Sequence, residues 1–98
     1  MISVALVALG AASASADDHD LVEAGHQVYD TYCMQCHGER LVNPGSSFDL
    51  RELHPDERAR FEKSVLDGKG SQMPPWRGII GSAELDQLWA YIRENAYD

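Results

Sequence analysis

The sequence holds only two cysteines in 98 residues and lacks a second Cys or His pair at metal-ligand spacing. That scarcity excludes a structural zinc site, which needs four ligands. No stretch alternates between apolar and polar residues, so the βαβ setting of a thioredoxin-like redox pair is also missing. Acidic residues outnumber basic ones by 16 to 8, and a chain this acidic is disfavoured as a nucleic-acid binder.

Both cysteines lie in one short motif, Cys33-Met34-Gln35-Cys36-His37. A disulfide across two intervening residues would close too small a loop to restrain the unfolded chain much. The order is instead typical of c-type haem attachment. In such a site the two thiols each add across a haem vinyl group, and the adjacent histidine becomes the proximal iron ligand. The motif therefore predicts one covalently bound haem c held by Cys33, Cys36 and His37.

The N-terminus has the pattern of a secretory signal peptide. Residues 1–12 are almost wholly apolar, and Ala14-Ser15-Ala16 forms an A-x-A cleavage signal before the acidic run at residues 17–20. No Lys or Arg precedes the apolar run, which departs from the usual pattern. The run falls well short of the ~20 residues that span a bilayer, so no membrane anchor is expected. We predict a cleaved signal peptide over residues 1–16, a mature domain over residues 17–98 and export to the periplasm.

The mature chain is expected to be all-α, with loops rich in Gly and Pro. Apolar residues at helical spacing predict helices over residues 20–33, 55–67 and 83–95. Asp20 and Ser82 are the expected N-caps of the first and last of these helices. Pro55 suits the first turn of the middle helix, and Gly68 suits its end. A domain this small buries a low fraction of its surface, and a covalent haem would supply a large apolar surface at its centre.

Charge is spread unevenly along the chain. Residues 17–30 hold five acids and no base, and residues 78–98 hold four acids and a single Arg, whereas residues 38–77 are balanced. Because the attachment motif directly precedes the balanced segment, we expect a redox partner to meet an apolar centre with Lys69, Arg77 and Arg40 as rim charges.

At these positions the mature chain resembles the small class I c-type cytochromes. The attachment motif continues into Gly38, and Gly25 with Tyr29 resembles the glycine and aromatic pair of the family's first helix. Leu88 and Tyr91 resemble its last helix. The resemblance implies a class I cytochrome c fold with three main helices wrapped around one haem, in which the first and last helices cross almost at right angles at a glycine.

The resemblance also implies the remaining haem contacts. Gln72-Met73-Pro74-Pro75 resembles the loop that brings the sixth iron ligand, and electron-carrying c haems favour His/Met ligation. Met73 is therefore the expected sixth ligand, with His54 as its competitor. Pro44 is expected to place its carbonyl on the free nitrogen of His37. Trp76 is expected to cover the haem and donate its N–H to a propionate, and Arg51 and Arg77 are further candidates for propionate contacts.

Ligation on both faces of the iron predicts an electron carrier that turns over no substrate. We expect a monomeric, freely diffusing periplasmic cytochrome between redox proteins, with a dehydrogenase as donor and an oxidase or another cytochrome as acceptor. Residues 70–80 resemble cytochromes that accept electrons from quinoprotein alcohol dehydrogenases. Two alternatives stay open: a haem enzyme or gas sensor with a displaceable Met73, and a c-type subunit of a larger respiratory complex.

Overall fold

The computed structural model describes residues 18–45 and 47–97, so the signal peptide predicted over residues 1–16 lies outside the described part. The N-terminal helix covers residues 18–32. It is followed by α2 (Met34–His37), α3 (Arg58–Asp67) and α4 (Ser82–Asn95), with short 3-10 helices η1 (Glu39–Leu41), η2 (Leu50–Glu52) and η3 (Pro55–Glu57) between α2 and α3. The described residues contain no strand, only an isolated bridge between Lys69 and Met73. The expected all-α class is confirmed.

None of the helices in the described ranges is long and apolar enough to span a bilayer.

The ends of the helices follow the predicted signals closely, with two corrections. The N-terminal helix already includes residues 18–20, so Asp20 lies inside it and is not its N-cap. Pro55 opens η3, which leads directly into α3, and Gly68 ends α3 with a positive φ of 75°. Ser82 is the first residue of α4 rather than its N-cap, which is Gly81. The Glu84 side chain accepts the Gly81 N–H at 3.0 Å. Glu84 is the third residue of α4 and satisfies the backbone at its N-terminus, so the Ser82 hydroxyl is not needed as a cap.

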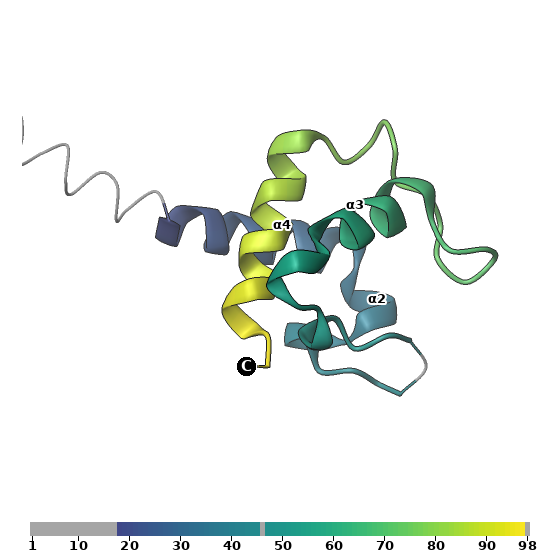
Figure 1. Cartoon of the computed structure of the whole chain (residues 1–98), viewed down its shortest axis with the longest axis horizontal. Helices are drawn as coiled ribbons and strands as arrows, with labels where there is room; N and C mark the ends of the chain where they lie inside the picture. The colour runs from purple at the N-terminus through teal and green to yellow at the C-terminus, as the bar shows by residue number, and fades with distance from the viewer. Residues whose placement is uncertain (1–17, 46, 98) are drawn as a thin grey trace, which may run out of the picture.

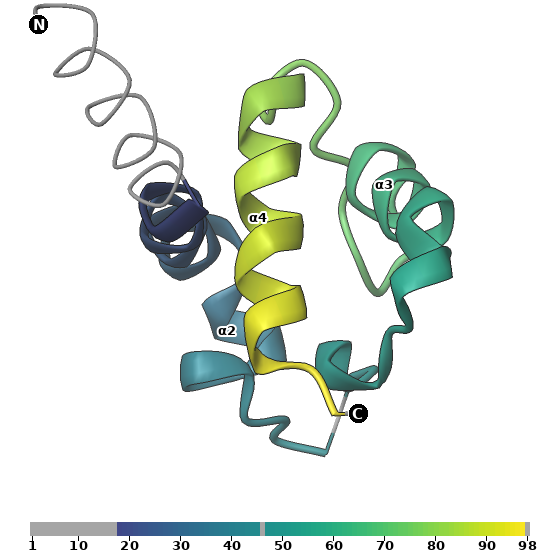
Figure 2. The same ribbon diagram turned by 60° about the vertical axis from the view of Figure 1, so that its left-hand side comes forward.

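The N-terminal helix crosses α4 at a steep angle (Figures 1 and 2), as the resemblance implied. The crossing point is Gly25, where a Cβ atom would lie 1.9 Å from the backbone oxygen of Gln87 and 2.9 Å from Cβ of Tyr91. Only a residue without a side chain allows the two backbones to approach this closely. Next to the crossing, the His26 ring stacks on Tyr91 with centroids 4.8 Å apart.

One apolar core packs between the helices. Its buried side chains come from the N-terminal helix, η1, α3, α4 and the loops between them: Tyr29, Leu41, Leu53, Phe61, Val65, Ile80, Leu85, Leu88, Tyr91 and Ile92. Phe61 and Val65, the buried residues of α3, are 4% exposed each. The Phe61 ring packs 5.1 Å from that of Trp89. Side chains at one edge of this core, together with the attachment motif, line the cavity described next.

Candidate functional site

The attachment motif is held at the end of the N-terminal helix by backbone hydrogen bonds. The Cys33 N–H donates to the Tyr29 carbonyl at 2.8 Å, and the His37 N–H donates to the Cys33 carbonyl at 3.0 Å. The motif therefore forms one helical turn, α2 with Cys33 as its N-cap, which fixes the two thiols and the imidazole relative to one another. The Tyr29 hydroxyl donates to the Gly38 carbonyl at 2.5 Å, and this bond ties the helix to the residue after the motif.

Gly38 is required where the chain leaves the motif. Its φ is 93°, and a Cβ atom there would lie 1.8 Å from the Val42 carbonyl oxygen. The chain turns back at this point through Arg40 and Leu41, which both have positive φ values of 55° and 68°. Leu41 is almost fully buried. Its packing in the core holds the strained turn that follows the motif.

The two cysteines are not bridged to each other. Burial raises the pKa of the Cys33 thiol to about 12, and the neighbouring Cys36 adds to the effect. Redox-active cysteines need a depressed thiol pKa in an electropositive setting. The environment of Cys33 is the opposite, so it disfavours a thioredoxin-like pair and leaves covalent attachment of a prosthetic group as the use of the motif.

A cavity of about 800 Å³ opens beside the motif. Cys33, Cys36, His37, Met73 and Trp76 all line it, although they come from two segments far apart in the sequence. Its size lies within the 300–1,000 Å³ typical of cofactor sites. Two thiols, an imidazole and a thioether around one apolar cavity are the donor set that a covalent haem uses. The residues present therefore fit the group that the motif predicts.

His37 is oriented by a backbone carbonyl. Its Nδ1 lies 3.1 Å from the Phe48 carbonyl oxygen, and because a carbonyl can only accept, Nδ1 carries the proton. The Nε2 lone pair is left to bind a metal. Burial lowers the pKa of His37, and the bond to Phe48 only partly offsets this. The neutral imidazole, the form that ligates iron, is thus favoured.

The partner of His37 differs from the expected one. The sequence suggested the Pro44 carbonyl, whereas the structure uses that of Phe48, 11 residues after the histidine. Pro44 does not line the cavity. The loop between them is closed by Asn43, whose side chain donates to the Ser47 carbonyl at 2.6 Å and accepts the Gly45 N–H at 2.6 Å. Ser47 in turn donates its hydroxyl to the Cys36 carbonyl at 2.8 Å. This turn carries the chain past Pro44 and brings Phe48 to the histidine.

Met73 is held by the loop that follows α3. The Lys69 N–H donates to the Met73 carbonyl at 2.9 Å, and the Met73 N–H returns to the Lys69 carbonyl at 3.3 Å. A Cβ atom at Gly68 would lie 2.4 Å from the Met73 oxygen, so glycine is needed for the loop to close. The Trp76 backbone N–H donates to the Val65 carbonyl at 2.9 Å, which fastens the far side of the loop to α3.

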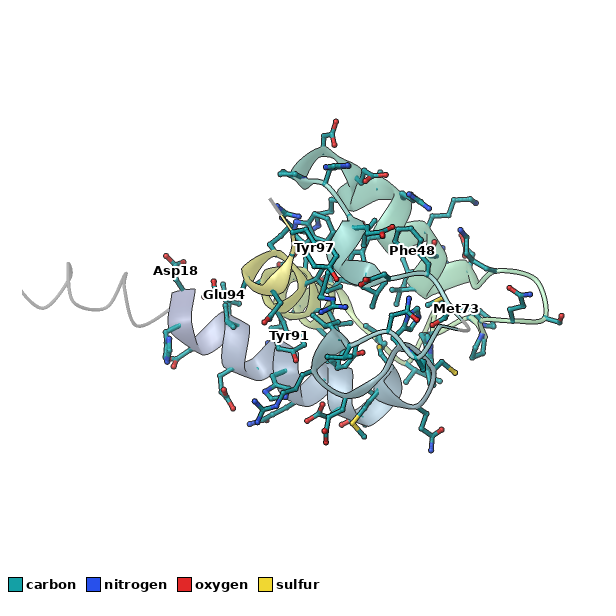
Figure 3. The ribbon with its side chains drawn as sticks, turned by 90° about the horizontal axis from the view of Figure 1, so that it is seen from below. Asp18, Phe48, Met73, Tyr91, Glu94 and Tyr97 are labelled. Carbon is teal, nitrogen blue, oxygen red and sulfur yellow. The ribbon has the colours of Figure 1, made fainter. Side chains whose placement is uncertain are left out.

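Figure 3 shows Met73 and Phe48 on the side of the molecule away from Asp18 and Glu94. His54, the competing sixth ligand, is exposed and does not line the cavity. Its backbone N–H donates to the Glu57 carboxylate at 2.9 Å as part of the start of η3. Position therefore favours Met73 as the sixth ligand.

The three residues predicted to contact the propionates differ in their position relative to the cavity. Trp76 lines the cavity, and its ring packs 5.0 Å from that of Tyr32. Arg51 and Arg77 do not line it. Arg51 forms an ion pair with Asp49 at 3.1 Å, and Arg77 one with Asp67 at 2.6 Å. Both arginines are held by neighbouring acids, which is the commoner use of a surface arginine.

Two basic residues line the cavity, Arg60 and Lys69. Lys69 was predicted as a rim charge, whereas Arg60 was not predicted. The Arg60 guanidinium lies 4.6 Å from the Phe48 ring centroid and bonds the Glu57 carboxylate at 2.9 Å. The described lining includes no Asp or Glu, a contrast with the acidic surface. No sequence signal marks Arg60, because its side chain is 47% exposed and it only adjoins the buried Phe61 in α3.

Fold and site together define a c-type cytochrome. The model of the family described as cytochrome C oxidase, cbb3-type, subunit III, matches residues 20–92, and the chain belongs to this family. Membership implies a covalently bound haem c and a role in electron transfer.

The chain is also similar to two curated proteins of Pseudomonas putida. It is 34% identical over 86 residues to quinohemoprotein alcohol dehydrogenase ADH-IIG, covering 87% of this chain and 12% of that protein. It is 32% identical over 79 residues to quinohemoprotein alcohol dehydrogenase ADH IIB, covering 79% of this chain and 11% of that protein. This chain thus spans about an eighth or less of the length of these relatives. No solved structure matches it significantly.

Proposed function

We propose that the protein is a periplasmic electron carrier with one haem c, attached through Cys33 and Cys36 and ligated by His37 and Met73. The observation that carries the proposal is the convergence of all four side chains on one cavity of about 800 Å³. When bound, the haem supplies an iron that changes oxidation state without consuming a substrate. The chain's residues attach it, provide its axial ligands and exclude water from it.

The two ligand-bearing segments divide this task. His37 offers Nε2 to the cavity because its Nδ1–H is committed to the Phe48 carbonyl. Met73 offers a thioether, a ligand that raises the reduction potential relative to a second histidine. With His37 and Met73 both bound to it, the iron would have no open position for a substrate or gas. This arrangement favours electron transfer over the alternatives of a haem enzyme and a gas sensor.

The donor we propose is a quinoprotein-type alcohol dehydrogenase. The support is the likeness to two quinohemoprotein alcohol dehydrogenases, from which we infer that this chain corresponds to their haem-carrying part. Such a domain receives electrons from a quinone cofactor held elsewhere, whether in the same chain or in a partner. An oxidase or another cytochrome would then accept the electrons.

The mouth of the cavity supplies a docking surface for that donor. Lys69 and Pro74 are exposed and line the cavity. Of the other two predicted rim charges, Arg40 does not line the cavity. Arg77 is engaged by Asp67 through two hydrogen bonds at 2.6 and 3.0 Å. Lys69 is therefore the rim charge expected to influence the encounter. The acids at the start of the N-terminal helix lie on the opposite side, as the position of Asp18 in Figure 3 shows.

Stopped-flow reduction of the haem-loaded protein by a quinoprotein alcohol dehydrogenase and its alcohol tests the proposal. We expect second-order reduction that slows with Lys69→Glu and whose dependence on ionic strength changes, because rim charges mainly set the association rate. Asp18→Lys is the matched control and should leave the rate almost unchanged. Failure of the wild-type protein to accept electrons, combined with rapid carbon monoxide binding when reduced, would favour the gas-binding alternative.

A further inference from the structure

The C-terminus is fastened to the segment that carries the hydrogen-bond acceptor of His37. Figure 2 shows the end of the chain after α4 lying beside η2. The Tyr97 N–H donates to the Arg51 carbonyl at 2.9 Å, and the Tyr97 hydroxyl donates to the Asp49 carboxylate at 3.1 Å. The Arg51 guanidinium lies 4.9 Å from the Tyr97 ring centroid. We call these three residues, Asp49, Arg51 and Tyr97, the C-terminal clasp.

The Asp49 carboxylate is the centre of the clasp. One oxygen accepts the Arg51 N–H at 3.0 Å and its Nε at 3.1 Å. The other accepts Nη2 of Arg51 at 3.2 Å as well as the Tyr97 hydroxyl. The Asp49 side chain is 16% exposed, and its bonds to Arg51 are partly buried, whereas the bond from Tyr97 is open to solvent. Together they fix Asp49 at the start of η2.

Fixing Asp49 also fixes the carbonyl that orients His37. The Phe48 carbonyl and the Asp49 N–H belong to one planar peptide unit. The direction of that carbonyl, which accepts Nδ1 of His37 at 3.1 Å, therefore follows the position of Asp49. From the other side, the Phe48 ring lies under the Arg60 guanidinium. Phe48, whose carbonyl accepts the hydrogen bond from His37, is thus held through both its side chain and its peptide bond.

We propose that Tyr97 is a positioning residue for the proximal histidine: through Asp49 it holds the Phe48 carbonyl against Nδ1 of His37 and so lowers the reduction potential. The proposal rests on the proposed ligation by His37. A hydrogen bond from the second ring nitrogen makes a histidine a stronger donor to its metal. A stronger donor stabilises the more positive, oxidised iron, so a looser Phe48 carbonyl raises the potential.

Tyr97→Phe in the haem-loaded full chain tests this role with the loss of one oxygen atom. The ring over Arg51 and the backbone N–H bond remain, so the fold is retained while the bond to Asp49 is lost. The exchange rate of the His37 Nδ1 proton, measured by NMR in the reduced protein, should rise about fivefold, since a solvent-exposed hydrogen bond to a carboxylate is worth roughly that factor in an equilibrium. The reduction potential should rise, and Tyr97→Ala should raise it further.

The matched control is Asn95→Ala, which removes a 2.9 Å hydrogen bond from Asn95 to the Tyr91 carbonyl at the same end of α4. It leaves the clasp intact and should change neither the potential nor the exchange rate. An unchanged potential and exchange rate in Tyr97→Phe, or equal changes in Asn95→Ala, would overturn the proposal. A wild-type protein without a covalent haem or without the far-red sulfur-to-iron band would refute the proposed function instead, so the two failures are distinguishable.

Discussion

Replacing Gly25 by alanine tests the helix crossing that holds the fold together. The added Cβ would lie 1.9 Å from the backbone oxygen of Gln87, 2.6 Å from its carbonyl carbon and 2.9 Å from Cβ of Tyr91. Contacts under 3 Å with backbone atoms cannot be relieved by rotating a side chain. The N-terminal helix and α4 must therefore move apart, which loosens the side chains that line the cavity below the crossing.

The expected cost is the difference of two effects. Overpacking a well-packed core costs about 1–3 kcal/mol, and the rigid backbone partner at Gly25 places this site at the upper end. Alanine inside a helix gains about 1 kcal/mol over glycine. The net loss is then about 2 kcal/mol, which for a domain of this size lowers Tm by roughly 8–16 °C.

Thermal unfolding of the haem-loaded protein, followed by circular dichroism, measures this loss. Gly81→Ala is the matched control: a Cβ there meets only Glu84 Oε1, at 4.0 Å, and the φ is −89°. As an N-cap change it should cost at most about 1 kcal/mol. If Gly25→Ala were as stable as Gly81→Ala, the close crossing of the helices would be wrong.

Two further predictions concern acid stability and maturation. Burial raises the pKa of Asp49, but the hydrogen bonds from Arg51 and Tyr97 outweigh it and leave the pKa below its usual value. The stabilisation is therefore present above about pH 4 and is lost as the pH falls through the folded-state pKa. Asp49→Asn should be less stable than wild type to urea near neutral pH, with the gap closing in acid, and a gap that widened in acid would contradict this sign. Intact mass of the protein secreted from the full sequence should show cleavage after Ala16 and one haem, and a mass that retained residues 1–16 would contradict the predicted export.

The helices were predictable because each is marked by strong local signals. Pro55 and Gly68 bracket the middle helix as expected, and the attachment motif identified the cysteines and His37 without any tertiary information. Gly25 was predictable only through the family resemblance. Its small size has no local explanation in the middle of a helix, and the reason becomes visible only when Gln87 is placed against it.

The contacts made by the long loops could not be predicted from the sequence. The identity of the carbonyl that meets His37 depends on how the chain turns at Asn43, and the side-chain bonds there place Phe48 rather than Pro44 beside the imidazole. The assignments of Arg51 and Arg77 to the propionates stay predictions. A guanidinium has several possible acidic neighbours, and which of them Arg51 and Arg77 choose is settled by tertiary contacts.

The ligands of the iron are the central claim, and the absorption spectrum of Met73→Ala tests it most directly. His54→Ala is the control, because His54 is exposed and outside the cavity lining. We predict that Met73→Ala keeps its covalent haem but loses the far-red sulfur-to-iron band, has a lower potential and binds carbon monoxide when reduced, whereas His54→Ala matches wild type in all these properties. A far-red band that survives in Met73→Ala, or disappears in His54→Ala, would contradict the account.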